Sequence, residues 1–160
     1  MIGILFNFLL IANLFLFLIQ PVFALRTMDY SKQALIEADF SSQDLHGVTF
    51  NLANLLKANL SECNLEGASL FRAKLQEANL SNSNLSGATL DSAVLEDTNL
   101  DNTILENAFA FDTRFTNVSI KGADFTNVLI DQNALEELCK IADGVNPVTR
   151  RSTRDTLDCS

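Results

Sequence analysis

Apolar residues recur at every fifth position from Leu35 to Ile130, and this spacing is the main regularity of the chain. A second set, mostly Ala, Ser, Thr or Cys, lies two residues before each of them, and the remaining places are mostly Asn, Asp, Ser, Glu, Lys or Gly. A helix buries residues three or four apart and a strand buries alternate residues, so a period of five fits neither. In an α-helix, successive leucines would point to opposite sides, and the Asn, Ser and Gly content would disfavour the helix further.

Repetition at a short fixed period is instead typical of a solenoid, in which each coil buries its inward side chains against the next coil. About twenty consecutive units cover residues 33–132. We therefore expect the apolar fifth residues to form the buried core of such a stack. With roughly 1.5–3 kcal/mol for each buried Leu or Phe before entropy, such a core is adequate without a metal or cofactor.

The five-residue units resemble those of a known family. Units such as ANLSE, CNLEG, ASLFR, AKLQE and ANLSN match the A(D/N)LXX pattern of pentapeptide-repeat proteins. This resemblance implies an all-β solenoid, a right-handed quadrilateral β-helix with four units per coil and about five coils. It also implies that the central Leu or Phe of each unit and the small residue two places earlier point inward. Equivalent residues on one side would then be twenty positions apart and stack at about 4.8 Å, the spacing of paired strands.

Polar residues twenty positions apart form outward columns under this arrangement. One column is Asp39, Asn59, Asn79, Asn99 and Ser119, and the next is Asp44, Asn64, Asn84, Ile104 and Asp124. A ladder of metal or ligand contacts is one interpretation. We favour a structural role, because stacked Asn and Asp side chains satisfy turn backbone groups and one another.

The first 24 residues differ from the repeat and predict an export signal. Residues 2–19 are apolar except for Gly3, Asn7 and Asn13, and Pro21-Val22-Phe23-Ala24 is typical of a processing site, with the cut after Ala24. No Lys or Arg precedes the apolar run. The alternative is an uncleaved membrane anchor, since about 18 apolar residues can just span a bilayer.

Both ends of a solenoid need caps. Residues 25–32 are the expected entry segment, with Asp29 or Ser31 as a cap. Residues 133–160 are the expected C-terminal cap, made of two short helices. For the first, ALEELCKIA, Asp131 or Asn133 is the candidate N-cap, and its apolar stripe is Leu135, Leu138, Ile141 and Ala142. For the second, RDTLDC, the candidate N-cap is Thr153. Between the two helices, we expect Gly144 to end the first helix and Asn146-Pro147 to form a turn. Val145 and Leu157 are expected to add apolar contacts.

Two of the three cysteines, Cys139 and Cys159, lie in this tail, whereas Cys63 falls in an inward position. In an exported protein, a pair on adjacent helices favours a disulfide. Two unrelated thiols or a metal-binding pair are the alternatives. On the chain-entropy account, closing this loop would stabilise the fold by roughly 3 kcal/mol.

The segment LCKIADGVNPVTRRSTRDTLDC resembles the C-terminal segment of pentapeptide-repeat proteins of the thylakoid lumen in cyanobacteria and chloroplasts. Those proteins share the pattern LC-x-IA-x-G-x-NP-x-T followed by TR-x-(S/T)-L-x-C, and the resemblance implies that the two cysteines are joined. It also implies a location in the thylakoid lumen or periplasm, and the short leader suits a cyanobacterium. The sequence departs from the pattern at Arg150-Arg151, where a glycine is expected, which makes this loop more basic.

Charge and composition restrict the classes of function. Eleven basic and 20 acidic residues give a formal net charge of −9, which argues against nucleic acid or an anionic membrane as a direct partner. The same charge would suit a mimic of DNA. The single histidine, His46, falls in an outward place without the Cys or His neighbours that a metal site needs, and no nucleophile–base pair is evident. We expect no catalytic site, no cofactor and no metal.

One irregularity concerns the aromatic residues. The inward place at position 110 is an alanine flanked by Phe109 and Phe111, and Phe71 and Leu129 lie near them in the expected columns. A local bulge could turn one phenylalanine inward to fill the space beside Ala110. We favour the alternative, an exposed apolar interaction patch of Phe71, Phe109, Phe111 and Leu129.

Together these features predict a non-enzymatic exported scaffold that binds an unidentified protein and responds to redox state through Cys139 and Cys159. A thioredoxin-like reductant or oxidant acting on that pair is the expected redox partner. One alternative is an acidic DNA mimic that inhibits a DNA-binding enzyme such as gyrase. Another is a scaffold tethered to the membrane by an uncleaved leader; otherwise the mature form is expected to make no membrane contact.

Overall fold

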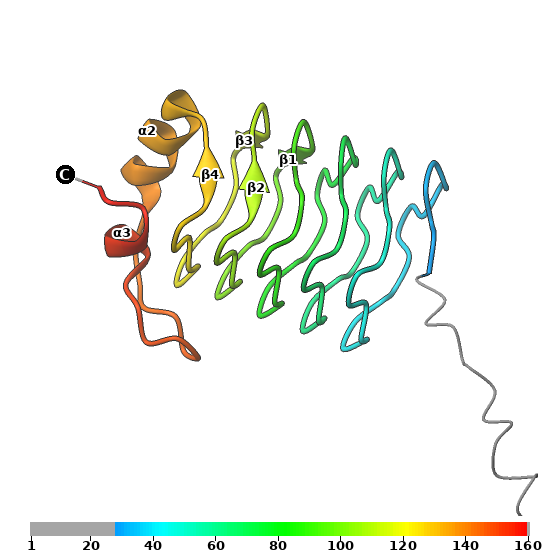
Figure 1. The fold of residues 1–160 in the computed structure, drawn as a ribbon, viewed down its shortest axis with the longest axis horizontal. Coiled ribbons are helices and arrows are strands. Elements are labelled where there is room, and N and C mark those ends of the chain that lie inside the picture. Colours follow the sequence, from blue (N-terminus) through cyan, green and yellow to red (C-terminus); the bar gives the residue numbers. More distant parts are fainter. Residues whose placement is uncertain (1–27, 160) are drawn as a thin grey trace, which may run out of the picture.

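The computed structural model describes residues 28–159, so the predicted leader lies outside the described residues. The chain winds into a stack of similar coils, closed at one end by two helices (Figure 1). Residues twenty positions apart pair in parallel along the stack, as in the series Asp29, Thr49, Ser69 and Thr89. This interval of 20 residues agrees with the coil of four units that the family resemblance implies.

Each coil has four pairing positions, one in every five-residue unit, as the bridges from Asp29, Ala34, Asp39 and Asp44 show for the first coil. Around the central leucine of a unit, the backbone bonds alternate in direction. Leu45 N donates to Asn64 O at 2.8 Å in the following coil, and Asn64 N donates to Gln43 O at 3.0 Å in the preceding one. These bonds hold neighbouring coils in register.

A tight turn follows most of the central residues. Val48 N donates to Leu45 O at 3.1 Å, and Gly47 between them has φ +64°. The same left-handed conformation recurs at every fifth residue from Lys32 to Asn127, although most of these residues are not glycine. A turn hydrogen bond with positive φ at its third residue is a type II turn. The period of five thus comes from one turn per unit.

The axis of the stack is filled by the two inward sets of side chains. Leucines at the central positions from Leu45 to Leu105 are fully buried, and so are most small residues two places earlier. Where that small residue is Thr or Cys, its hydroxyl or thiol donates to the carbonyl oxygen 23 positions earlier, whereas the Ser83 hydroxyl donates to Leu80 O in its own coil. Examples are Cys63 to Phe40 O at 2.9 Å and Thr98 to Leu75 O at 2.8 Å.

Extended pairs occur on two sides of the stack. Strand β1 (Val94–Glu96) pairs in parallel with β3 (Arg114–Thr116), and β2 (Phe109–Ala110) pairs with β4 (Leu129–Ile130). Phe109 is in register with Leu129 and with Thr89 on its other side. The chain does not bulge at Ala110, which is itself buried, so the bulge considered for this position is wrong.

At the N-terminal end, pairing already begins at Asp29, inside the segment expected as an entry cap. Tyr30 takes the central position of an additional unit, and its ring stacks on Phe50 at 5.2 Å and meets the edge of Phe40 at 5.6 Å. The Asp29 side chain accepts a hydrogen bond from Ser31 N at 2.8 Å. A layer of aromatic rings therefore covers this end of the leucine column.

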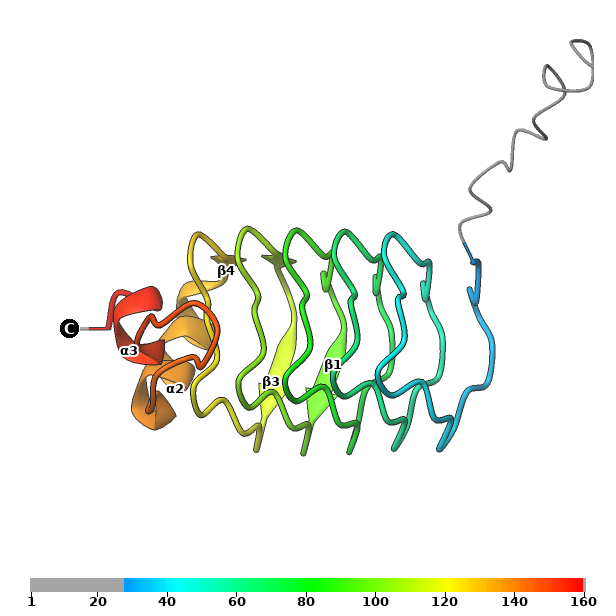
Figure 2. The same cartoon turned by 90° about the horizontal axis from the view of Figure 1, so that it is seen from below.

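Helices α2 (Gln132–Ile141) and α3 (Thr153–Thr156) cover the other end (Figures 1 and 2). Leu138 of α2 and Leu157, just after α3, are buried against the last coil. Val145 is 57% exposed and does not add the expected apolar contact.

The helix caps differ from the sequence expectation. Asp131 is the N-cap of α2 by position, but its side chain makes no capping bond and instead accepts from Asp112 N at 3.0 Å. The N-cap of α3 is Ser152, whose side chain accepts from Asp155 N, and not Thr153. Thr153 is the first helical residue and is fully buried, and its N–H donates to Gly144 O at 3.1 Å.

Candidate functional site

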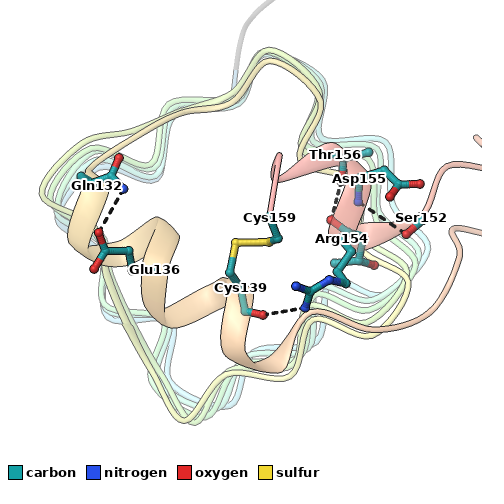
Figure 3. The surroundings of a disulfide bond; sticks show 9 residues. Gln132, Glu136, Cys139, Ser152, Arg154, Asp155, Thr156 and Cys159 are labelled. Atoms are coloured by element: carbon teal, nitrogen blue, oxygen red, sulfur yellow. Dashed lines mark hydrogen bonds between the residues drawn. A yellow bond between two sulfur atoms is a disulfide. The ribbon is translucent and has the colours of Figure 1, made fainter.

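The C-terminal cap is locked by a disulfide between Cys139 and Cys159. The sulfur atoms are 1.97 Å apart, and the bond joins α2 to the residue next to the C-terminus across 20 positions. Seen along the stack, the bridge lies over the middle of the outline of the coils (Figure 3). Arg154 of α3 donates from Nη1 to Cys139 O at 3.2 Å beside it. The predicted pairing is confirmed, and both cysteines are only partly buried.

A buried asparagine fastens the loop between the two helices to the stack. Asn146 is fully buried, and its side-chain nitrogen donates to the carbonyl oxygens of Asn102 and Gly122 at 3.1 and 2.9 Å. Its side-chain oxygen accepts from Val148 N and Thr149 N at 2.9 and 3.1 Å. The sequence predicted only a turn here, and the single available signal was the NP dipeptide of the tail pattern. The side chain satisfies groups of two coils and of its own loop at once.

Arg151, in the loop that departs from the family pattern, makes charged contacts with two coils, and we call this set of contacts the clamp. Its guanidinium donates to Glu106 Oε2 at 3.0 Å and to Thr126 Oγ1 at 2.6 Å, and lies 3.3 Å from Asp124 Oδ2. Glu106 belongs to one coil and Asp124 to the next, so a single cap residue joins both. Arg150, by contrast, is exposed and has left-handed backbone.

The Asp124 carboxylate is fully buried, and its pKa is nevertheless lowered from its ordinary value. Burial by itself would raise this pKa, but hydrogen bonds from Thr126 and Thr149 and the positive charge of Arg151 outweigh that effect. The carboxylate is therefore charged at neutral pH, and the clamp is an ion pair with one buried partner.

Two glycines allow the cap to approach the last coil closely. Gly122 N donates to Asp143 O at 2.8 Å. A Cβ added at Gly144, which has φ +85°, would lie 2.9 Å from Gly122 N. Gly144 thus follows the first cap helix as expected, and it also makes room for the backbone of the stack.

A second candidate site is one side of the stack, which we call the Phe side: the units centred on residues 30, 50, 70, 90, 110 and 130. The three phenylalanines that are exposed within residues 28–159 all lie there, together with Leu129. The exposed fractions are 40% for Phe71, 42% for Phe109, 48% for Phe111 and 47% for Leu129. Exposure of these four side chains agrees with the patch predicted from sequence; what it binds stays a prediction.

The four residues of this patch are not all direct neighbours. Phe109 and Leu129 are direct neighbours in paired strands, and Phe111 follows Phe109 on the same outward surface across the buried Ala110. Phe71 lies two coils away from Phe111, with Asp91 between them. Asp91 Oδ1 accepts from Phe111 N at 2.9 Å, and Asn51 Oδ1 accepts from Phe71 N at 3.1 Å.

The polar columns have the structural role that the sequence predicted. Asn59 donates to Asp39 Oδ1 at 3.1 Å and Asn64 to Asp44 Oδ1 at 3.0 Å, each from one coil to the preceding one. Their own oxygens accept from the backbone two residues later, as Asn59 does from Ser61 N at 3.2 Å. These hydrogen bonds also lower the pKa of Asp39, chiefly through Ser41 N.

The residues examined for chemistry are dispersed. His46 is exposed, and Cys63 is buried in the column, where burial raises the pKa of its thiol. Within residues 28–159, no three His, Cys, Asp or Glu side chains gather as metal ligands, and no helix is long and apolar enough to cross a membrane. Acidic side chains lie on all four sides, for example Asp91, Glu96, Asp101 and Glu106.

Comparison with known proteins gives a consistent result. Residues 35–70, 68–107 and 95–130 match the family described as pentapeptide repeats. Over 49 residues, the chain is 49% identical to thylakoid lumenal 15 kDa protein 1, chloroplastic, of Arabidopsis thaliana; the match covers 31% of this chain and 22% of that protein.

Solved structures extend the similarity to most of the fold. A pentapeptide repeat protein from the Arabidopsis thaliana thylakoid lumen superposes with a TM-score of 0.80 at 42% identity, covering 81% of this chain and 90% of its own. A pentapeptide repeat protein from Nostoc superposes with a TM-score of 0.55 at 29% identity, covering 64% of this chain and 84% of its own.

Proposed function

The chain belongs to the pentapeptide-repeat family, and from this premise we propose that it is an exported, non-enzymatic scaffold that binds another protein in the thylakoid lumen or periplasm. The observation that carries the proposal is the cap closed by a disulfide. It occurs in a chain that is 42% identical, over 81% of this chain, to a protein of the thylakoid lumen. Disulfides persist in oxidising compartments and are rare in reducing ones.

The architecture supports a binding role over a catalytic one. Turn and ladder hydrogen bonds hold each side of the stack rigid, and Leu and Ala side chains fill its axis. The full architecture we propose is the right-handed quadrilateral β-helix, supported by four bridges per 20-residue coil and by the similarity to the lumen protein. Solenoids of this kind present extended surfaces to partners.

We also propose that the cap responds to redox state. The disulfide closes the segment that carries Asn146 and Arg151, so its reduction would loosen both contacts with the stack. Because Cys139 and Cys159 are partly exposed, a thioredoxin-like oxidoreductase could reach them.

Two measurements on the full-length chain, expressed in a cyanobacterium, test the proposal. The mass of the mature protein should correspond to cleavage after Ala24, and the protein should fractionate with the lumen or periplasm. Cross-linking in intact cells should then join it to a specific protein. An uncleaved chain in the membrane fraction would favour the tethered scaffold, and an uncleaved chain in the cytoplasm would favour the DNA mimic; either result would contradict export.

A further inference from the structure

The Phe side carries a regular alternation of acidic and aromatic groups. Positions 20 apart on its outward surface are Asn51, Phe71, Asp91, Phe111 and Asp131, and the backbone N–H of each phenylalanine donates to the Asn or Asp one coil earlier. Adjacent coils are about 4.8 Å apart, so Phe71 and Phe111 are about 10 Å apart along the stack, as are Asp91 and Asp131.

The aromatic residues form a strip rather than isolated points. Phe109 stands next to Phe111 on the outward surface, and Leu129 extends the apolar surface by one coil toward α2. Exposed large apolar side chains are absent from the two sides centred on residues 40 and 45 and their 20-residue equivalents in the described chain. On the remaining side, centred on residue 35 and its equivalents, Ile36 is the single exposed large apolar residue in the described chain, so the strip lies on one side.

The charge around this strip is mainly negative. From Leu70 to the start of α2, the outward residues of the Phe side include Asp91, Asp112 and Asp131, with Arg72 as their basic neighbour. The whole chain has a formal charge of −9. A partner that matches this surface needs apolar groups for the strip and basic groups for its rim.

On this basis we propose that the Phe side binds a basic amphipathic helix of another protein, lying along the stack. This inference rests on the proposed scaffold function and names its binding surface. Seven residues of an α-helix span about 10.5 Å, which matches the interval between Phe71 and Phe111. Apolar residues at i and i+7 would contact the two phenylalanines, and Lys or Arg at i+3 or i+4 would lie opposite Asp91.

A second copy of this chain is a poorer occupant for two reasons. Its own Phe side is acidic, so face-to-face contact brings like charges together. The four exposed side chains also offer only a few hundred Å², whereas a stable interface buries roughly 800 Å² per partner. An area of that size suits one helix.

The test uses the oxidised mature protein and a synthetic helical peptide of about 18 residues, with leucine at i and i+7 and lysine at i+3 and i+4. A matched peptide carries glutamate in place of lysine. Fluorescence anisotropy should show binding of the basic peptide, weakened by salt, and no binding of the acidic one. Equal binding of both peptides, or no binding of the basic one at about 1 mM, would overturn the inference.

Variants locate the contact. Phe111→Ser should weaken binding about tenfold or more, and Asp91→Asn severalfold with a smaller salt dependence. Val148→Ser removes an exposed apolar side chain from the cap and Asp97→Asn removes a charge from another side, so both should bind as the parent does. The side chains of the four substituted residues all point outward. We therefore expect every variant to fold, and thermal unfolding checks this. Unchanged binding by Phe111→Ser would overturn the inference.

Other occupants give different results. If the protein binds zwitterionic vesicles and this binding requires Phe111, the occupant is a lipid surface and not a helix. If sedimentation shows a dimer that Phe111→Ser dissociates, the occupant is a second copy of the chain. The cross-linking experiment in cells separates the two proposals. If the parent and Phe111→Ser cross-link to the same protein equally, the scaffold stands and this surface is wrong; if the parent cross-links to none, the scaffold itself is wrong.

Discussion

The side-chain nitrogen of Asn146 lies 2.9 Å from the carbonyl oxygen of Gly122, 24 residues earlier in the chain, and donates a hydrogen bond to it. The carbonyl oxygens of Gly122 and of Asn102, its equivalent one coil earlier, lie at the left-handed turn position, whose carbonyl accepts no backbone hydrogen bond from a neighbouring coil within residues 28–159. Asn146 supplies a donor to both of them, at 2.9 and 3.1 Å. The cap is thus attached by side-chain hydrogen bonds to two coils, as well as by apolar packing.

Replacing Asn146 with alanine should therefore destabilise the protein by about 2–3 kcal/mol, since several buried backbone groups lose their partners. The effect should be largest in the cap. Chemical denaturation measures the total, and hydrogen exchange should show lost protection at Val148 N and Thr149 N, which now bond to Asn146. Asn133→Ala, at an exposed position of α2, is the control and should change stability little.

Breaking the disulfide should lower the free energy of unfolding by about 3 kcal/mol, because a loop across 20 positions is no longer closed in the unfolded chain. Cys139→Ser and Cys159→Ser should each have this effect, and the double variant should add little to either one. Denaturation of the oxidised and reduced parent provides the comparison. If reduction changed the stability of Cys139→Ser as much as that of the parent, the disulfide would not be the cause.

The Asp124–Arg151 pair predicts a specific pH dependence. The pKa of Asp124 is below its ordinary value of 3.8 in the folded protein. Its charged form therefore stabilises the fold at neutral pH, and this contribution is lost as pH falls below about 4, through the folded pKa. The stability difference between the parent and Asp124→Asn should stay constant from pH 7 to 5 and shrink toward pH 3.

Urea denaturation of both proteins across that range makes the measurement. Arg151→Gln serves as a second comparison, because it leaves the buried carboxylate without its cation; it should destabilise the parent more than it destabilises Asp124→Asn. Equal effects in the two backgrounds would show that Arg151 acts independently of Asp124.

The left-handed turn position at Leu52 should accept a better residue. Leu52 has φ +60°, which a β-carbon disfavours, and its side chain is 43% exposed, so it contributes little burial. Leu52→Asn should raise the free energy of unfolding by about 0.5–1 kcal/mol, because asparagine tolerates this conformation. Leu56→Asn, outside the positive-φ positions, should give no such gain in thermal unfolding.

Much of this protein follows from its sequence alone. The period of five predicts a solenoid, and the resemblance of its units to pentapeptide repeats implies the 20-residue coil, the residues that point inward and the polar residues that stack. The sequence also predicted the disulfide between Cys139 and Cys159 and the exposure of Phe71, Phe109 and Phe111. Such inferences succeed because every unit makes the same contacts with its neighbours, so a local pattern encodes the long-range pairing.

The tertiary structure decided the rest. Tyr30 falls five residues before Leu35 and continues the period, but the structure decided that the stack begins with its unit. The capping by Ser152, the buried bonds of Asn146 and the clamp from Arg151 to Asp124 and Glu106 carry no periodic signal. Each of the last two contacts joins groups 24 to 45 residues apart across an irregular loop. Their geometry depends on how that loop folds back over the last two coils, and only the folded chain brings those atoms together.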